Sequence, residues 1–533
     1  MRRLVVAASP DLVEHGERSF VERMESPRAG TATYSAVLSA ADCRDIDDAA
    51  YADARSWYRA SGGEDLSLHD GASLGRSFEY VATAELVRVK RARLVLERLG
   101  AEARVGQVIL RSVAREWAIA ADQLGLEVHS DRPPPSGPLP GTRSVTPQRY
   151  HRVAALALSP FARSPQLAIV DTRAWAVQHG AALADRWALE SIDPGPRFVL
   201  GMLRGRRPMK SRWLADLRAQ GSRPDPVAVP ASSDRLSFLS DIFRDYAADL
   251  AAAVTFGIER ASRYRLAVTC QDVLPPIRAF LLGFRAGGGR VVTLEHGISG
   301  AYSDQVLSIS DAVGVWGEPQ RAYHSALLGP DQRVHVLGWP RLEGVAPHPD
   351  HRADWDVVFF AQPPPDLAAG GWPEDAIRSR NLVQEYATSH PHRRVATKPH
   401  PSTESFGWDS ETNGGVKVVH GGSLDVLQRT RVAIVELSTT GIEAMALGVP
   451  VVQLGRAGIL HGPDFISESG APRPTNAIEL ADTVEALLTD PAMRSRSRDR
   501  GRAYAQEFVA TLDQPGEAGR RLRSVVSDLE RVG

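Results

Sequence analysis

Short apolar runs alternate with longer stretches of helical periodicity along the whole chain. A run of β-branched and other apolar residues is followed by a loop and then by apolar positions spaced three and four apart, and this cycle repeats. The alternation predicts an α/β protein, with parallel sheets covered by helices on both faces. Because the cycle runs through both halves, we expect two Rossmann-like domains facing a central cleft.

In the first half, the pattern predicts a long helix with a continuous apolar stripe that includes Leu74, Phe78 and Val81, with Gly100 as its stop. A second helix follows, and then a strand–helix–strand unit with proline at the start and glycine at the end of its helix. The predicted strands are 2–9, 33–40, 103–110, 265–272 and 290–297, and the predicted helices are 73–100, 239–261 and 275–289.

The second half shows the same alternation of strands and helices more regularly. Its predicted strands are 356–362, 393–401, 416–422, 431–437 and 449–455, and its predicted helices are 379–390, 424–430 and 438–448. A stretch rich in proline, glycine and charge near 340–352 lacks periodicity and indicates a boundary. The expected domains are 1–340 with a helical insertion, 341–515, and a closing helix, 516–533, that packs back on the first domain.

Composition narrows the protein class. Hydrophobic residues make up 43% of the 533 positions, and 63 Lys and Arg nearly balance 64 Asp and Glu, so a nucleic-acid partner is not expected. Two cysteines, and no apolar run near the ~18 residues of a membrane span, predict a cytoplasmic protein. We interpret the basic stretch 204–213 as a solvated face; peripheral contact with the inner face of a membrane stays open.

One strand–helix junction in the second half is the strongest candidate for a ligand site. A predicted strand leads into Ser438, Thr439 and Thr440, which stand where the next helix begins. Hydroxyl and free N–H groups at a helix N-terminus, together with the helix dipole, form a site for anions. We expect Gly441 to let a ligand approach the backbone and Glu443 to accept hydrogen bonds from ribose hydroxyls. Simple N-capping by Ser438 is the alternative.

A lysine, a histidine and two prolines end an earlier strand of the same predicted sheet. Lys398, His400 and Pro401 stand at its carboxyl end, the edge where open α/β sheets bind ligands. Proline on either side restricts the backbone at His400, so the imidazole is held in place. It can donate to a phosphate or protonate a leaving group. We therefore expect this motif and the Ser438 junction to form one phosphate site.

Two motifs in the first half also stand where chemistry is expected. Glu295, His296 and Gly297 end a predicted strand, and we expect His296 and Gly297 to face the cleft. Asp70 stands on a short turn between a strand and a helix, where a carboxylate can serve as general base on an acceptor hydroxyl. The alternatives are a satisfied loop histidine at His296 and helix capping by Asp70 or Ser73.

The sequence offers no convincing metal or cofactor motif. Asp45 and Asp47 have the spacing of a carboxylate pair that binds metal, but no strong strand precedes them, and we interpret them as part of a solvated loop. The motifs typical of zinc peptidases, P-loop proteins, serine hydrolases and dinucleotide-binding proteins are missing. We therefore expect neither a metal nor a cofactor.

Through these motifs, the second half resembles bacterial surface-polysaccharide glycosyltransferases that use CMP-activated acidic sugars. These are the sialyltransferases, polysialyltransferases and Kdo transferases of capsule assembly. They carry a His-Pro motif and a Ser/Thr motif on the donor-binding lobe, matched here by His400-Pro401 and Ser438-Thr439-Thr440. The resemblance covers roughly residues 290–515.

In the first half, the resemblance rests on a single motif. Bacterial sialyltransferases carry an acidic-acidic-Gly motif whose second acid is the base. The corresponding residues here are His69, Asp70 and Gly71, so the second acid and the glycine are present and the first acid is replaced by histidine.

The resemblance implies a GT-B fold and a metal-independent, inverting transfer. Lys398, His400 and the Ser438–Thr440 helix start would neutralise the departing phosphate, and Asp70 from the other lobe would deprotonate the acceptor. The implied partners are a nucleotide-sugar donor, CMP-linked, and a glycan or lipid-linked acceptor in surface-polysaccharide synthesis. The oligomeric state is not indicated.

Three alternatives stay open. A CDP-polyol phosphotransferase of the teichoic-acid type would share the His-Pro motif and the helix start, with His296 as its base. A UDP-sugar transferase or a sugar-nucleotide epimerase would share the fold. A non-catalytic scaffold relative would keep the fold and lose nucleotide binding, and the intact Ser-Thr-Thr triplet argues against it.

Overall fold

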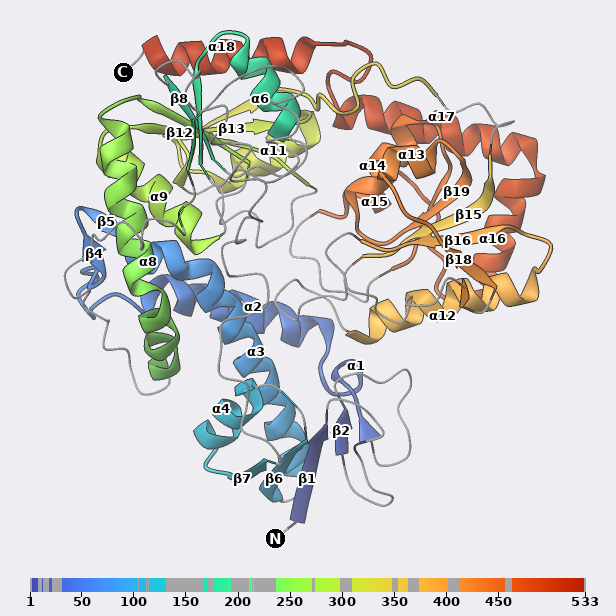
Figure 1. Ribbon diagram of the computed structural model, residues 1–533. Helices are drawn as coiled ribbons and strands as arrows, with labels where there is room; N and C mark the ends of the chain where they lie inside the picture. The colour runs from blue at the N-terminus through green and yellow to red at the C-terminus, as the bar shows by residue number, and fades with distance from the viewer. Residues whose placement is uncertain are drawn as a thin grey trace. The chain divides into compact units, whose positions relative to one another are not determined.

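The computed structural model shows an α/β protein whose described residues are 2–7, 12, 19–21, 31–103, 105–111, 113, 115–130, 166–170, 176–192, 210–212, 214, 236–270, 274–297, 309–347, 353–362, 373–400, 412–413, 415–455 and 463–531 (Figure 1). Contacts divide it into two compact units. Unit 1 comprises Met1–Asp53, Thr83–Gly137 and Ala346–Ala505, and unit 2 comprises Ala54–Ala82, Pro138–Val345 and Gln506–Gly533. The ranges predicted for the domains stay a prediction.

Three parallel sheets share one strand order. When the parallel strands of each sheet are numbered in chain order, the first five lie side by side in the order 3-2-1-4-5. This is the doubly wound Rossmann-like arrangement. The α/β class and its Rossmann-like sheets are therefore confirmed. The sequence led us to expect one such sheet before residue 340, and the structure has two.

The first sheet belongs to unit 1 and lies close to the N-terminus. Its strands, in spatial order, are β3 (Thr31–Ala32), β2 (Ser19–Val21), β1 (Arg2–Ala7), β6 (Val105–Arg111) and β7 (Glu127–Ser130). Its helices are α1 (Tyr34–Val37), α2 (Ala40–Ser56), α3 (Leu74–Ala103) and α4 (Arg115–Gln123). The aromatic rings of Phe20, Tyr34 and Trp117 meet in its core, with the first two ring centroids 4.9 Å apart.

The strand predicted at 33–40 is wrong, because this segment forms α1. Tyr34 and Leu38 are buried in the core and Val37 packs against it, a spacing of three and four residues that suits one side of a helix. The loop predicted around Asp45 and Asp47 is also wrong. Both residues lie in α2, where Asp47 is buried and its Oδ1 lies 3.2 Å from Arg91 Nη2.

The second sheet forms the body of unit 2. Its seven parallel strands, in spatial order, are β10 (Lys210–Arg212), β9 (Leu189–Ile192), β8 (Leu167–Val170), β11 (Leu266–Thr269), β12 (Arg290–Leu294), β13 (Ala312–Val315) and β14 (Arg333–Val336). The helices of this unit are α6 (Ala176–Ala184), α8 (Ser237–Ala261), α9 (Pro275–Ala286), α11 (Glu318–Leu327) and α18 (Glu517–Arg531). Helices α6 and α18 pack on one face of the sheet, and α8 and α9 lie on the other side (Figure 1).

The segment after residue 505 is held on unit 2 by contacts between side chains and backbone. Glu343 accepts hydrogen bonds from the N–H groups of Gly516 (2.8 Å) and Ala518 (2.6 Å), and so caps the start of α18. Gly338 has φ +88°, and a Cβ there would lie 2.0 Å from the hydroxyl oxygen of Thr511. Close approach of this segment therefore requires glycine at position 338.

The third sheet belongs to unit 1 and contains most of the residues singled out by the sequence. Its strands, in spatial order, are β17 (Thr412–Asn413), β18 (Val416–Val418), β16 (Val395–Lys398), β15 (Trp355–Phe360), β19 (Thr430–Val435) and β20 (Val451–Gln453), with only β17 antiparallel. Its helices are α12 (Pro373–Ser389), α13 (Ser423–Leu427), α14 (Thr439–Ala446), α15 (Phe465–Glu468), α16 (Ala477–Thr489) and α17 (Pro491–Phe508). Helices α12 and α16 cover one face, and α13 and α14 the other (Figure 1).

The arginines of α17 have a structural use. Arg494, Arg500 and Arg502 donate to carbonyl oxygens at the C-terminal ends of α16, α15 and α14, respectively. A cation at these positions satisfies carbonyls that lack partners within their helix and offsets the negative end of the helix dipole.

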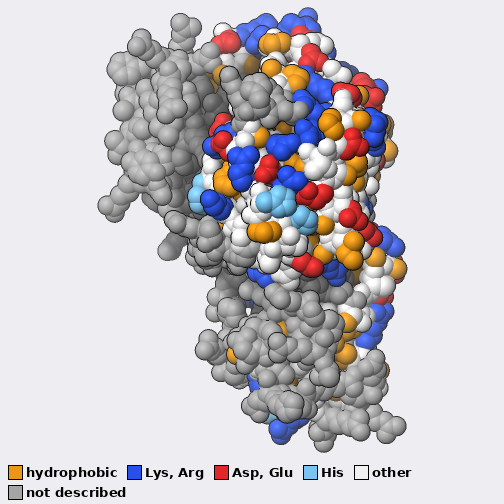
Figure 2. Space-filling view, turned by 90° about the vertical axis from the view of Figure 1, so that its right-hand side faces the viewer, with side chains coloured by type: hydrophobic (Ala, Val, Ile, Leu, Met, Phe, Trp, Pro, Cys, Tyr) orange, Lys and Arg blue, Asp and Glu red, His pale blue; other side chains and the backbone are white. Residues whose placement is uncertain are grey.

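On the face shown in Figure 2, described basic and acidic side chains interleave and hydrophobic ones are scattered among them, which is typical of a solvated surface.

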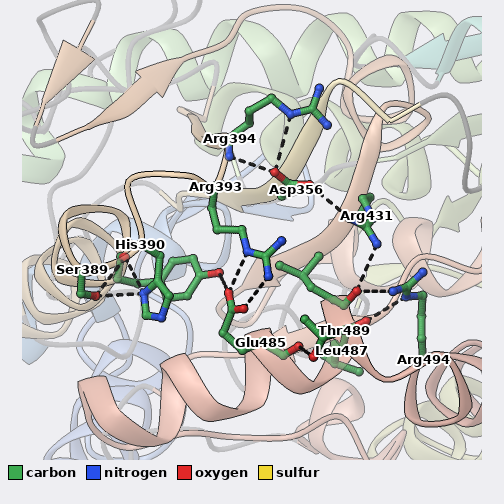
Figure 3. Close-up of polar contacts among 12 residues, drawn as sticks. Asp356, Ser389, His390, Arg393, Arg394, Arg431, Glu485, Leu487, Thr489 and Arg494 are labelled. Carbon is green, nitrogen blue, oxygen red and sulfur yellow. Dashed lines mark hydrogen bonds and ion pairs between the residues drawn. The ribbon is translucent and has the colours of Figure 1, made fainter.

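Ion pairs lie at the amino ends of β15, β16 and β19 and link these ends to one another (Figure 3). Asp356 accepts from the Arg394 N–H at 3.0 Å and from Arg431 Nη1 at 3.3 Å. Burial alone would raise the pKa of Asp356, but these hydrogen bonds and charges hold it below its ordinary value. Arg393 donates to both carboxylate oxygens of Glu485, Nε to Oε1 at 3.0 Å and Nη2 to Oε2 at 2.5 Å.

We expect Glu485→Gln to destabilise the protein by about 1–2 kcal/mol at pH 7, because it removes a charge-assisted, two-bond pair. Burial tends to raise the pKa of Glu485, but the hydrogen bonds from Arg393 and Tyr386 bring it below the ordinary value. The stabilisation is therefore complete above the unfolded pKa of about 4.3 and lost as the pH falls through the lower folded value. Melting temperatures of the variant and the wild type should converge in acid.

The matched control is Glu385→Gln, which changes an exposed glutamate on α12. It should leave the melting temperature unchanged at every pH. A Glu485→Gln difference that stays constant from pH 7 down to pH 3 would contradict the linkage between the pair and folding.

Candidate functional site

The strand register of the third sheet gathers the C-terminal motifs on one edge. Phe360, the last residue of β15, pairs with Lys398 at the end of β16 and with Val435 at the end of β19. The residues that follow these strands therefore leave the sheet at the same level. Strand order reverses between β15 and β19, and ligands of open α/β sheets bind outside the carboxyl ends of strands at such a switch point.

Lys398 and His400 lie at this edge, as the sequence predicted. Lys398 is the last residue of β16 and only 8% exposed, and its Nζ donates to the carbonyl oxygen of Pro399 at 3.5 Å. His400 is half-buried, two residues past the strand. Pro401 lies outside the described residues. The structure thus provides one enclosed cation and one imidazole beside β15.

The start of α14 follows β19 at the same edge. Ser438 is the N-cap, with extended backbone and an Oγ that accepts from the N–H of Thr440 at 3.2 Å. The N–H of Gly441 bonds to the Ser438 carbonyl at 2.9 Å. Ser438 therefore caps α14, and two of the N–H groups expected to face a ligand are used within the cap. The hydroxyls of Thr439 and Thr440, both half-buried, and the dipole of this eight-residue helix remain for an anion.

Packing accounts for Gly441. A Cβ at this position would lie 2.6 Å from Cδ1 of Ile466 and 3.4 Å from Cγ2 of Val435. The glycine therefore allows α14 to sit against α15 and β19, and the expectation that it admits a ligand to the backbone stays a prediction. Glu443, one turn further along α14, is 3% exposed.

Sequence reasoning missed Glu436 at the end of β19. It is 1% exposed, and its Oε1 accepts from the Ser379 hydroxyl of α12 at 2.8 Å. This bond ties α12 to the strand beside the switch point. The signal that could have found it is an acidic residue directly after a buried apolar strand.

A second missed group lies past the neighbouring strand β20. The Arg473 guanidinium packs against Gly455, where a Cβ would lie 2.6 Å from Nε, and its Nη1 lies 3.4 Å from Asp464 Oδ2. Gln453, the last residue of β20, donates to Asp464 Oδ1 at 2.9 Å. Arginine suits phosphate recognition because its planar fork donates several N–H groups at once. No sequence motif marked Arg473, since its place depends on the loop that precedes α16.

Asp70 lies in unit 2 on a hairpin, which corrects the expected strand-to-helix turn. The hairpin consists of β4 (Leu68–His69) and β5 (Ala72–Ser73), joined by Asp70 and Gly71 with φ 50° and 79°. Positive φ at both central residues defines a type I′ turn, for which Asp-Gly is a favoured pair. Ser73, whose Oγ accepts from the N–H of Arg76 at 3.0 Å, caps α3, so helix capping by Asp70 is wrong.

The carboxylate of Asp70 contacts two polar side chains. Thr255 Oγ1, from α8, donates to Asp70 Oδ2 at 3.2 Å, and His69 Nε2 lies 3.3 Å from Thr255 Oγ1 and 3.5 Å from Asp70 Oδ2. The Asp70 side chain is 53% exposed, so it remains open to a ligand.

The Glu295 motif follows β12 in unit 2. Glu295 is buried, and its Oε2 accepts from the N–H of Trp316 at 3.1 Å while its Oε1 lies 3.7 Å from His324 Nε2. Its role is therefore structural. His296 and Gly297 are half-buried directly after it. Asp70, His296 and Gly297 thus belong to unit 2, and the phosphate-site candidates to unit 1.

The described residues bear on the metal and membrane predictions in two ways. Within the described ranges, no group of three or more His, Cys, Asp or Glu side chains is placed to hold a metal ion. No described helix has both the length and the apolar character needed to cross a membrane. The basic stretch 204–213 lies outside the residues whose side chains are described.

Comparison with known proteins finds likeness in structure only. No protein-family model matches the chain, and no curated protein is similar to it in sequence. HepE from Anabaena in complex with UDP-glucose aligns over 68% of this chain and all of its own, at 12% identity and a TM-score of 0.43. The glycosyltransferase SnogD from Streptomyces nogalater aligns over 68% of this chain and all of its own, at 15% identity and a TM-score of 0.42.

The wall teichoic acid polymerase TagF aligns over 72% of this chain and 93% of its own, at 9% identity and a TM-score of 0.39. The fold assignment rests on the strand order of the three sheets.

Proposed function

We propose that the chain is a glycosyltransferase that binds a nucleotide-activated sugar at the carboxyl edge of the third sheet. The observation that carries the proposal is the pairing of Phe360 with both Lys398 and Val435. That pairing puts Lys398 and His400 on one side of β15 and the Ser-Thr-Thr helix start on the other, at a Rossmann-like switch point.

The edge has the chemistry that a departing nucleotide phosphate requires. Lys398 supplies a positive charge that is only 8% exposed, so solvent screens it little. The threonine hydroxyls and the dipole of α14 supply further stabilisation, and Arg473 supplies a second cation past β20. His400 donates a proton to the phosphate oxygen as the bond between that oxygen and the anomeric carbon of the sugar breaks.

The donor we propose is a CMP-activated acidic sugar, of the sialic acid or Kdo type, with a glycan or lipid-linked acceptor in surface-polysaccharide synthesis. Support comes from the His400-Pro401 and Ser438–Thr440 motifs, which resemble those of the capsule enzymes. Asp70 is the proposed base, which removes the proton of the acceptor hydroxyl. The deprotonated acceptor then attacks in a single displacement, which inverts the anomeric centre. Glu443 is the proposed ribose contact.

Nucleotide binding followed by turnover tests this function. A thermal-shift screen with CMP, CDP, UDP and GDP should show the largest stabilisation with CMP. Release of free nucleotide should then be measured with glycoside acceptors and five donors: CMP-N-acetylneuraminate, CMP-Kdo, UDP-glucose, UDP-N-acetylglucosamine and CDP-glycerol. Turnover of a UDP-sugar alone would overturn the donor class. Turnover of CDP-glycerol would favour phosphotransfer, and binding of none would favour a scaffold.

We expect EDTA to leave turnover unchanged. The reason is that Lys398, His400 and the helix start offset the phosphate charge in place of a divalent ion. The measurement is nucleotide release after dialysis against EDTA, compared with the same sample after Mg²⁺ or Mn²⁺ is added back. Activity that disappears on chelation and returns with either ion would contradict the prediction.

A further inference from the structure

We propose that Thr255 is a positioning residue for the base Asp70, acting through a hydrogen-bond chain that begins at His69. The proposal rests on the proposed function, in which Asp70 removes the acceptor proton. Asp70 and Thr255 are 185 positions apart in the sequence, and their contact joins the tip of an exposed hairpin to α8.

The direction of the chain follows from counting protons. The single proton of the Thr255 hydroxyl is donated to Asp70 Oδ2 at 3.2 Å. The contact of 3.3 Å between Thr255 Oγ1 and His69 Nε2 therefore has the imidazole as donor, so Nε2 of His69 carries a proton. Each donor polarises the next, so the hydroxyl bond to the carboxylate is strengthened.

The hydrogen-bond chain from His69 through Thr255 binds one carboxylate oxygen of Asp70 and leaves the other without a bond from it. Within the described part of the chain, Oδ1 of Asp70 has no hydrogen-bond partner, and the side chain is 53% exposed. Oδ2 is thus the anchored oxygen and Oδ1 the one that receives the acceptor proton. Fixing the plane of the carboxylate in this way aims Oδ1, because a general base must meet the proton in hydrogen-bond geometry.

The anchor itself is rigid. Thr255 stands between two positions where α8 and α9 touch backbone to backbone. A Cβ at Gly257 would lie 2.2 Å from the carbonyl oxygen of Phe280, and a Cβ at Gly283 would lie 2.1 Å from the carbonyl oxygen of Val254. The short hairpin, whose strands have two residues each, takes its orientation from this packed pair of helices.

The test compares three substitutions on α8 and at its C-cap. Thr255→Val keeps the shape and removes the hydroxyl, and should lower kcat about tenfold, as expected for one hydrogen bond to a charged group. The KM for the donor selected by the nucleotide-release assay should stay unchanged. Thr255→Ser restores the hydroxyl and should restore kcat. Ser262→Ala removes a hydroxyl that donates to the Glu259 carbonyl at the end of α8, and should have no effect.

A double-mutant cycle separates positioning from a general structural effect. If Thr255 acts through the carboxylate, Thr255→Val should cost nothing further in an Asp70→Asn background. Equal losses in both backgrounds, or a Thr255→Val enzyme with wild-type kcat, would overturn the proposal. An Asp70→Asn enzyme with wild-type turnover would instead overturn the choice of Asp70 as base. Melting temperatures check that every variant is folded.

Discussion

Replacing Asp70 by asparagine should lower turnover by about 10²- to 10⁴-fold, the usual contribution of a general base. Asparagine has the same shape and still accepts a hydrogen bond from Thr255, but it cannot take a proton. It is also favoured in the type I′ turn that Asp70 and Gly71 form, so the hairpin should be retained. The measurement is nucleotide release at saturating donor.

CMP affinity and melting temperature should barely change in this variant, because Asp70 lies in unit 2 and the proposed phosphate site in unit 1. Turnover close to wild type would assign Asp70 to the turn alone. His296 would then be the next candidate for the base, since Glu295 is buried against Trp316.

His400→Ala should lower kcat by at least about 100-fold, since it removes a donor to the phosphate in the transition state. The matched control is His390→Ala. His390 stands between α12 and the amino end of β16, where its Nδ1 contacts the Ser389 hydroxyl at 3.0 Å (Figure 3). The control changes the same residue type at the opposite edge of the same sheet.

The control should keep wild-type turnover, and both variants should melt near the wild type. Equal turnover of His400→Ala and wild type would remove His400 from the site. It would leave Lys398 and the helix start to be tested in the same way.

The sequence was sufficient for what depends on local pattern. Apolar runs predicted the five parallel strands of the third sheet but not the antiparallel β17, and the Pro and Gly punctuation predicted α9. Because carboxyl ends of parallel strands share an edge, the pattern of strands was also enough to place Lys398, His400 and Ser438 together.

Contacts between segments far apart in the chain could not be predicted from the sequence pattern. The 3-2-1-4-5 order and the separate N-terminal sheet depend on which strands pair, and no pattern within a strand encodes its neighbour. The packing role of Gly441 was missed because Ile466, the side chain that requires it, comes from another helix. Thr255 and Arg473 were missed for the same reason.

One error was local. The segment 33–40 was interpreted as a strand, yet Tyr34, Val37 and Leu38 have the spacing of a helix. Over so few residues the two periods are hard to separate, and burial against Trp117 decides between them.

A crystal structure of the protein with CMP tests the central claim most directly, because three Rossmann-like switch points compete for the nucleotide. We predict the phosphate at the carboxyl edge of β15 and β19, within about 3 Å of a threonine hydroxyl at the start of α14 and of Lys398 or His400. A nucleotide at the carboxyl ends of β1 and β6, or of β8 and β11, with the α14 edge unoccupied, would contradict it.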